Sequence, residues 1–144
     1  MSAKAAWPSG VARHVLPTVD STNAHALRLA PSLTGPAWFL GLEQTAGRGR
    51  RSRPWVSPLG NFYATLLMQL QEPAELVALR SFTAALALRE AFVQLTKLPE
   101  AFALKWPNDV LLNGGKVAGI LLESSTSPRG MDLALGIGVN LIGA

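Results

Sequence analysis

The sequence contains no cysteine, which excludes a disulfide framework and thiol chemistry. It has no apolar run near the roughly 18 residues that a membrane-spanning helix needs, and residues 1–12 lack the apolar stretch of a secretory signal. Its two histidines are isolated, without metal-ligand spacing, and no Ser–His–Asp pattern is present. Because cysteine-free chains suit a reducing compartment, we expect a soluble cytoplasmic protein with no membrane partner.

Charge is sparse and unevenly distributed. Only 15% of the 144 residues are charged and 49% are hydrophobic, which favours one folded domain over a disordered chain. Thirteen basic residues against nine acidic ones leave a net charge of +4, and four of the thirteen fall within positions 48–53. A nucleic-acid-binding protein usually spreads its basic residues along a face or helix. This concentration therefore favours a small anionic ligand.

The basic residues belong to segment 43–55, the basic loop, which reads EQTAGRGRRSRPW. Because glycine has no side chain to bury and four neighbouring guanidiniums cannot be desolvated together, the segment can be neither a core strand nor a core helix. Arginine presents a planar fork of donors to carboxylates and phosphates, and glycine lets backbone N–H groups approach a ligand. We predict a surface loop that binds anions, although the loop alone would also fit a nucleic-acid patch.

Hydrophobic patterning predicts an α+β fold. We expect a loose leader over 1–10, helices over 24–33 and 75–95, and strands over 14–19, 37–44, 62–70, 102–105, 110–112, 116–123 and 131–141. The turn signal Asn113-Gly114-Gly115 and similar breaks join the strands mostly as hairpins. The prediction is therefore a mixed, mainly antiparallel sheet with helices packed on one side. The helix over 75–95 is apolar on opposite faces and is expected to be largely buried.

Three shorter motifs accompany the basic loop. Ser21-Thr22-Asn23 supplies small hydrogen-bonding side chains at a helix start, Lys105-Trp106-Pro107-Asn108-Asp109 places a carboxylate in a rigid turn, and Lys116 heads an apolar strand. Taken singly, these motifs have plain structural interpretations as a helix cap, a turn and a strand end. Their combination with the basic loop is what indicates a function.

In this order the motifs resemble the catalytic domain of biotin protein ligases, the biotin–[acetyl-CoA-carboxylase] ligases of the biotin/lipoate protein ligase superfamily. The matching segments are Ser21-Thr22-Asn23, EQTAGRGRRSRPW at 43–55, KWPND at 105–109, GKVAGIL at 115–121 and GIGVNL at 136–141. They run from residue 21 to 141, almost the whole length of the chain, and the basic loop and KWPND are each specific. The resemblance implies a class II synthetase-like biotin ligase domain.

The resemblance implies an ATP-dependent ligase reaction in two steps. Biotin and MgATP first give biotinyl-5′-adenylate and pyrophosphate, and the biotinyl group then passes to a lysine of a biotin carboxyl-carrier protein domain. ATP and Mg²⁺ are therefore the implied cofactors, and biotin is a substrate. No nucleic-acid partner is implied, and a homodimer is left open.

The resemblance also implies roles for particular residues. The implied biotin contacts are Ser21, Thr22, Asn23, Gln44, Gly47, Arg48, Gly49, Arg50, Lys116 and Gly119. The implied ATP or adenylate contacts are Arg48, Arg50, Arg51, Trp55, Asn108, Lys116 and Asn140. The implied catalytic residues are Lys116, Arg48, Arg50 and Asp109, with Asp109 also placed at Mg²⁺ through the ATP phosphates. Cations between a carboxylate and a triphosphate offset the repulsion of two anions, so the residue types agree with these roles.

Two departures from the family pattern stand out. Ser52 occupies a position where the family usually has glycine, and its Cβ restricts the backbone. The chain also stops directly after an apolar strand. We therefore expect residues 1–144 to be one catalytic domain that is truncated at its C-terminus, without an N-terminal DNA-binding domain or a C-terminal barrel.

Three alternatives stay open at this point. The first is a lipoate or octanoate ligase, although no Arg-Arg-x-Ser-Gly-Gly-Gly segment is present. The second is a non-catalytic biotin-binding remnant, and the third is a nucleic-acid-binding protein that uses the basic loop. A competition test with lipoate separates the first from a biotin ligase, and formation of an adenylate excludes the other two.

Overall fold

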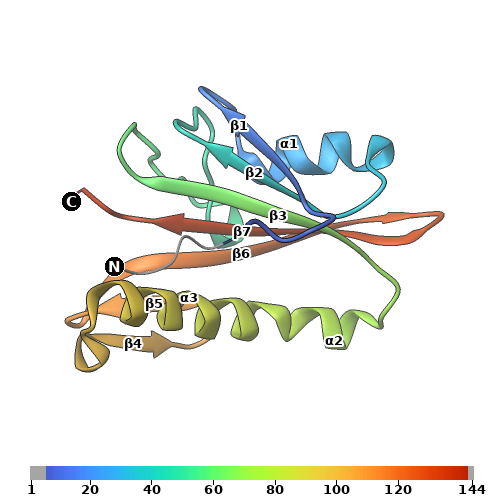
Figure 1. Ribbon diagram of the computed structural model, residues 1–144. Coiled ribbons are helices and arrows are strands. Elements are labelled where there is room, and N and C mark those ends of the chain that lie inside the picture. Colours follow the sequence, from blue (N-terminus) through green and yellow to red (C-terminus); the bar gives the residue numbers. More distant parts are fainter. Residues whose placement is uncertain (1–5, 143–144) are drawn as a thin grey trace.

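The computed structural model describes residues 6–142, so the first half of the expected leader and the last two residues lie outside it. Its strands are β1 (Ala12–Leu16), β2 (Ala37–Gly41), β3 (Phe62–Leu70), β4 (Phe102–Lys105), β5 (Asp109–Leu112), β6 (Gly115–Ser127) and β7 (Gly130–Val139) (Figure 1). Its helices are α1 (Thr22–Leu29), α2 (Ala74–Ala78) and α3 (Arg80–Thr96), with short 3-10 turns at Ala30–Ser32, Arg50–Ser52 and Pro99–Ala101. No helix within residues 6–142 is long and apolar enough to cross a membrane.

The strands form one mixed sheet in the order β1-β2-β3-β7-β6-β5-β4. β1 and β2 run parallel, and the other neighbouring pairs are antiparallel. Asn113 and Gly114 join β5 to β6 with φ values of 49° and 84°, as a type I′ hairpin turn requires. The expected α+β fold with a mainly antiparallel sheet is confirmed, although β1 begins and ends earlier than the pattern predicted.

The helices lie on opposite faces of this sheet, with α1 above it and α3 below it in Figure 1. Neighbouring residues of β7 show the same division, because Ala134 belongs to the core under α1 and Leu135 to the core under α3. Because side chains alternate between the two faces of a strand, β7 contributes side chains to both cores. The expectation that the helices pack on one side is therefore wrong. Both faces of β7 are apolar, and each face takes a helix.

The expectation of one largely buried helix over 75–95 is also wrong. The helix is broken at Leu79 into α2 and α3, and α3 meets the sheet along one face, where Ala85 is buried. Leu79 and Leu86 are 52% and 51% exposed in the part of the chain that the structure describes. Apolar residues on both sides of a helix do not show which side meets the sheet, and here the sheet covers only one.

The start of α1 is fixed by its flanking polar residues. Ser21 is the N-cap, and its hydroxyl oxygen accepts from the backbone N–H of Ala24. Asp20 accepts from the backbone N–H of Ser21 at 2.8 Å and from both terminal nitrogens of Arg28 at 2.9 Å. The Arg28 guanidinium lowers the pKa of Asp20 from 3.8 to about 2, against the opposing effect of partial burial.

The lowered pKa of Asp20 predicts a pH dependence of stability. A carboxylate whose pKa is lower in the folded state stabilises the fold above its unfolded pKa, and that contribution is lost as pH falls from about 4 toward 2. We expect Asp20→Asn to lower the thermal midpoint above pH 4 and to converge with the parent near pH 2, measured by circular dichroism. Arg28→Gln is the matched variant and should show the same convergence. Parallel curves for parent and variants would contradict this coupling.

Candidate active site

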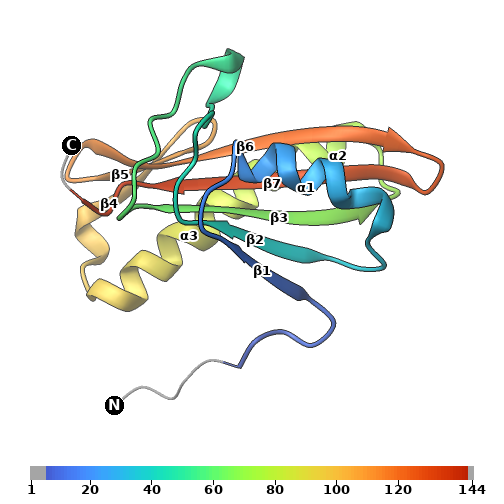
Figure 2. The same ribbon diagram turned by 90° about the horizontal axis from the view of Figure 1, so that it is seen from above.

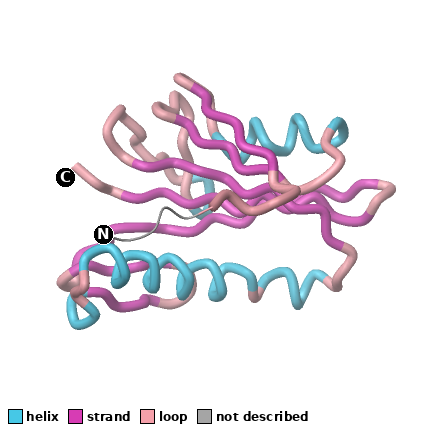
Figure 3. Tube along the Cα trace, in the orientation of Figure 1, coloured by secondary structure: helices cyan, strands magenta, loops and turns pink. Residues whose placement is uncertain are grey.

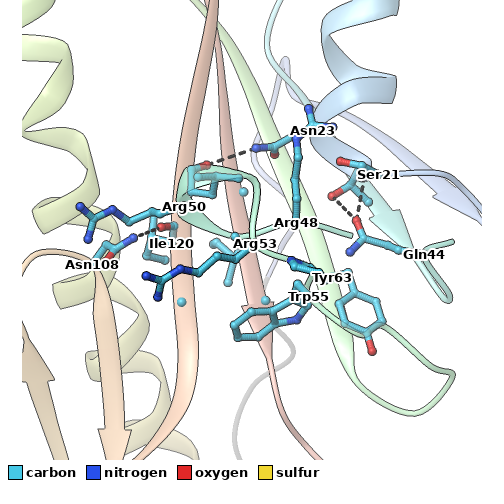
Figure 4. A pocket seen from close by; sticks show the side chains of 18 of the residues that line it. Ser21, Asn23, Gln44, Arg48, Arg50, Arg53, Trp55, Tyr63, Asn108 and Ile120 are labelled. Atoms are coloured by element: carbon cyan, nitrogen blue, oxygen red, sulfur yellow. Dashed lines mark hydrogen bonds between the residues drawn. The ribbon is translucent and has the colours of Figure 1, made fainter. Parts of the chain in front are cut away.

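A cavity of about 500 Å³ opens between the start of α1, the basic loop and strands β6 and β7. The basic loop is part of the long connection between β2 and β3 (Figure 3). The volume falls in the range of roughly 300–1,000 Å³ that is usual for small-molecule sites. The sequence-predicted site residues that line it are Ser21, Thr22, Asn23, Gln44, Arg48, Gly49, Arg50, Arg51, Trp55, Asn108, Asp109, Lys116 and Gly119 (Figure 4).

The end of the cavity beside α1 consists of neutral hydrogen-bonding groups. Ser21, Thr22 and Asn23 are each 4% exposed, because α1 begins against the sheet. Gln44 Oε1 accepts from the backbone N–H of Thr22 at 2.8 Å, and Gln44 Nε2 donates to Ser57 Oγ at 3.0 Å. The Gln44 amide is thereby held in one orientation. Donors and acceptors placed side by side suit a ligand group that offers both, such as an amide or a urea.

The tip of the basic loop is closed by its own backbone. The N–H of Gly49 donates to the carbonyl of Arg53 at 2.7 Å. Between them, Arg51 and Ser52 have φ values of 59° and 57°, in the left-handed region that costs a non-glycine residue about 1–2 kcal/mol. Ser52, where the family resemblance expects glycine, is one of these two residues. The backbone at this position therefore has a conformation that glycine would adopt without strain.

The opposite wall of the cavity holds Lys116 between two partners. Its Nζ lies 3.2 Å from Asp109 Oδ1 and 5.1 Å from the centre of the Trp55 ring. The ammonium is therefore held by an ion pair and a cation–π contact. Asn108 lies beside them, and its amide donates to the carbonyl of Ile120 (Figure 4). This bond fixes the turn that leads into β5.

Positive charge dominates the lining. It contains five cationic side chains and one carboxylate, namely Arg48, Arg50, Arg51, Arg53, Lys116 and Asp109. Two cations are paired, Lys116 with Asp109 and Arg48 with Glu123. Among the lining arginines, Arg50, Arg51 and Arg53 have no carboxylate partner in the described residues. Clustered cations in a cleft attract anions, so this end of the cavity suits a ligand with several negative charges.

Two predicted site residues do not line the cavity. Gly47 lies at the base of the basic loop, where a Cβ would come within 2.5 Å of the Trp55 carbonyl oxygen. Asn140 follows β7, and its backbone N–H donates to the carbonyl of Val117 at 2.8 Å. The roles implied for Gly47 and Asn140 as direct ligand contacts therefore stay predictions.

Sequence reasoning missed several lining residues. They are Arg53, Pro54, Tyr63, Ile120, Leu121, Gly136, Ile137 and Gly138. A Cβ on Gly136 would lie 2.5 Å from Asn23 Oδ1, and one on Gly138 would lie 3.0 Å from the Trp55 indole. The two glycines share one face of β7 because side chains alternate along a strand. The Gly136-Ile137-Gly138 pattern in the sequence could therefore have predicted this part of the cavity lining.

Comparisons with known proteins place this geometry among related folds. A family model described as the biotin/lipoate A/B protein ligase family matches residues 15–140. The chain is 59% identical over 131 residues to a biotin–[acetyl-CoA-carboxylase] ligase of Paracoccus denitrificans, a match that covers 90% of this chain and 55% of that protein. The biotin protein ligase of Leishmania major, solved with biotin, has a TM-score of 0.81 and 32% identity over 96% of this chain and 59% of its own.

The biotin protein ligase of Aquifex aeolicus, solved with biotin and ATP, has a TM-score of 0.77 and 34% identity, covering 92% of this chain and 53% of its own. The chain spans about half the length of the curated relatives that it matches. The family model nevertheless covers most of the present sequence, including the basic loop and Lys116. The chain therefore belongs to the biotin/lipoate A/B protein ligase family.

Proposed function

We propose that residues 1–144 belong to the biotin- and ATP-binding catalytic domain of a biotin–protein ligase that works in the cytoplasm. The observation that supports this proposal is a single cavity with two different ends. One end, at Thr22 and Gln44, has neutral donors and acceptors, and the other, at the basic loop and Lys116, is cationic. Biotin has a neutral ureido ring at one end and a carboxylate at the other. The relative from Paracoccus denitrificans bears this activity in its name, and the solved ligase of Aquifex aeolicus holds biotin and ATP.

The neutral end orients the ureido group. A urea donates two hydrogens and accepts at its oxygen, so it needs acceptors and donors in one plane. Ser21, Thr22, Asn23 and Gln44 supply both kinds, and each is held by the protein before ligand arrives. The carboxylate of a molecule bound in this way extends toward Lys116 and the basic loop, with Gly119 on the floor between them.

The cationic end promotes the first step, in which the biotin carboxylate attacks the α-phosphorus of ATP and pyrophosphate leaves. The reactants repel each other as anions, and negative charge builds up on the phosphoryl oxygens during the step. Lys116 and the unpaired arginines Arg50 and Arg51 offset both effects. Trp55 offers its ring to the adenine and Asn108 borders the adenylate, whereas Asn140 lies outside the cavity lining. No nucleophile from the protein is required, because the substrate carboxylate is itself the attacking group.

Mg²⁺ fits this site as an ion that arrives with ATP. Residues 6–142 contain no cluster of three or more metal-ligating side chains, and Asp109 is the carboxylate on the cavity wall. Mg²⁺ is commonly held by one or two carboxylates together with substrate phosphates, so Asp109 would hold the ion, and the ion would supply positive charge against the phosphates. In the second step a lysine amine of the carrier domain attacks the biotinyl carbonyl, and AMP leaves.

The test is to incubate the chain with labelled biotin and MgATP and to measure biotinyl-adenylate by chromatography and pyrophosphate release by a coupled assay. We expect adenylate at a rate that depends on both substrates. A parallel arm replaces biotin with lipoate or octanoate, which lack the ureido ring and should give little product. Equal rates with lipoate would contradict the substrate assignment. Biotin binding without any adenylate would contradict the catalytic one.

A further inference from the structure

Glu123 on β6 joins two parts of the site without lining the cavity. Its Oε1 accepts from the Asn23 amide at 2.9 Å. Its two oxygens also accept from Arg48, with Nε at 3.1 and 3.2 Å and Nη2 at 2.9 Å. One carboxylate on β6 thus binds both the start of α1 and the basic loop. Figure 4 shows Arg48 extending toward Asn23.

The geometry of this contact makes it stronger than an ordinary surface pair. The two side chains are only 34% and 27% exposed, so solvent screens them partly, and a forked arginine–carboxylate contact is among the stronger hydrogen-bonded pairs. Its support is a regular strand, since β6 pairs with β7 from Ala118 to Ser127 and places Glu123 opposite Ala134. The tip of the basic loop has no such support, because it is held by backbone bonds within the loop, whereas the start of the loop is bonded to Val19 and Asp20.

The contact also divides the arginines of the basic loop into two groups. Arg48 is occupied by the protein, whereas three arginines have no carboxylate partner in the described residues, namely Arg50, Arg51 and Arg53. A guanidinium that donates to a carboxylate through Nε and Nη2 keeps its Nη1 donors, but its charge is balanced by that partner, so it attracts a further anion less strongly than an unpaired arginine does. Arg48 therefore anchors the loop, and the unpaired arginines are the ones free to meet an anion.

We propose that Glu123 is a positioning residue that seats the basic loop over the cavity through Arg48 and orients the Asn23 amide at the same time. A single carboxylate then couples the neutral end of the cavity to its cationic end. The Arg48 contact sets where the loop lies beside the cavity, and with it where the unpaired arginines lie. The placement of the loop is independent of the proposed function, and only the kinetic measurement below rests on that function.

The direct test is limited trypsin digestion of the ligand-free full chain. Glu123→Gln keeps an oxygen that can accept from Asn23 but removes the charge that holds Arg48. Cutting after the loop arginines should become about tenfold faster, because proteolysis follows the population of the open loop and one charge-assisted pair is lost. Mass spectrometry assigns each cut to its arginine. Unchanged cutting within the loop would overturn the proposal.

Two controls separate this role from general destabilisation. Glu72→Gln breaks the Arg80–Glu72 pair, whose side chains are similarly exposed at 36% and 30%, and should leave loop cutting at the parental rate. Arg48→Gln should match Glu123→Gln, and the double variant should add nothing further, because both changes remove one interaction. Additive effects, or faster cutting spread over Arg89 and Arg129 with a lower thermal midpoint, would overturn the proposal.

A kinetic measurement then connects the loop to the proposed reaction. Because a smaller closed population weakens binding, Glu123→Gln should raise the KM for biotin more than it lowers kcat for pyrophosphate release. A lower kcat at unchanged KM would show that Glu123 acts on the chemical step, and would overturn its role as a positioning residue. If the parent itself makes no adenylate, the proposed function fails while the digestion result still decides the role of Glu123.

Discussion

Lys116→Ala is expected to slow pyrophosphate release about a hundredfold or more, since losing one preorganised electrostatic contact in a transition state typically costs roughly 3 kcal/mol. The ammonium lies at the cationic end of the cavity, 3.2 Å from Asp109 Oδ1 and 5.1 Å from the Trp55 ring centre. Both contacts hold it on the wall that the biotin carboxylate and the α-phosphate would share. Removing it leaves two reacting anions without their common counter-charge.

The same geometry predicts how other substitutions should behave. Lys116→Arg should restore only part of the activity, because a planar fork does not reproduce a compact point charge. Folding should be nearly unaffected, since the side chain is 45% exposed and exposed substitutions seldom exceed about 0.5 kcal/mol. Circular dichroism checks the fold and a coupled pyrophosphate assay measures the rate.

Lys105 provides the matched control for this prediction. It is an exposed lysine of the KWPND segment, and it neither lines the cavity nor pairs with a carboxylate in the described residues. Lys105→Ala should therefore keep the parental rate. A folded Lys116→Ala variant that is as active as Lys105→Ala would refute the role of Lys116, whatever family the chain belongs to.

The local elements of the fold could be predicted from the sequence because they depend on local chemistry. Turn residues such as Asn113 and Gly114 set a hairpin through their own backbone preferences, and alternating side chains mark the strands beside them. The side of the sheet on which each helix packs could not be predicted in this way. Leu86 on α3 is half exposed whereas Ala85 is buried, although the composition of the helix favours burial on both sides.

The site was predictable in its residue types but not in its pairings. Arginine and glycine in one loop predict an anion site, but the partner of Arg48 is a glutamate 75 positions away. Asp109 was expected at Mg²⁺, and the register that pairs it with Gly119 also brings it against Lys116. Such contacts follow from strand pairing and loop placement. A single sequence carries no direct record of either.

Gly47→Ala is expected to reduce adenylate formation by at least about a hundredfold, the loss that roughly 1 Å of misplacement at a reacting centre can cause. A Cβ at Gly47 would overlap Ser57 Oγ and lie 2.5 Å from the Trp55 carbonyl oxygen and 2.8 Å from Gln44 Nε2. A backbone carbonyl cannot rotate out of the way as a flexible side chain can. The base of the basic loop must therefore open.

Opening the base disturbs both ends of the cavity together. The N–H of Trp55 donates to the Gly47 carbonyl at 2.8 Å, and the Ser57 hydroxyl that binds Gln44 also donates to the Trp55 carbonyl. Displacing Trp55 thus releases Gln44 from its fixed orientation beside Thr22. We expect biotin affinity, measured by calorimetry, to fall along with the rate, whereas Lys116→Ala should affect the rate more than the affinity.

Gly49→Ala is the matched control, because it makes the same change in the same loop. A Cβ on Gly49 would find only the Arg53 carbonyl oxygen, at 3.8 Å, which is ordinary contact, and its φ of −105° is open to any residue. Gly49 lines the cavity, but the added methyl group does not displace the loop, so this variant should lose far less activity than Gly47→Ala. Equal activity of the two variants would mean that the close contacts at Gly47 do not determine the position of the basic loop. Loss in both would mean that the loop rejects any added side chain, and only loss confined to Gly47→Ala assigns the effect to that one contact with Trp55 and Ser57.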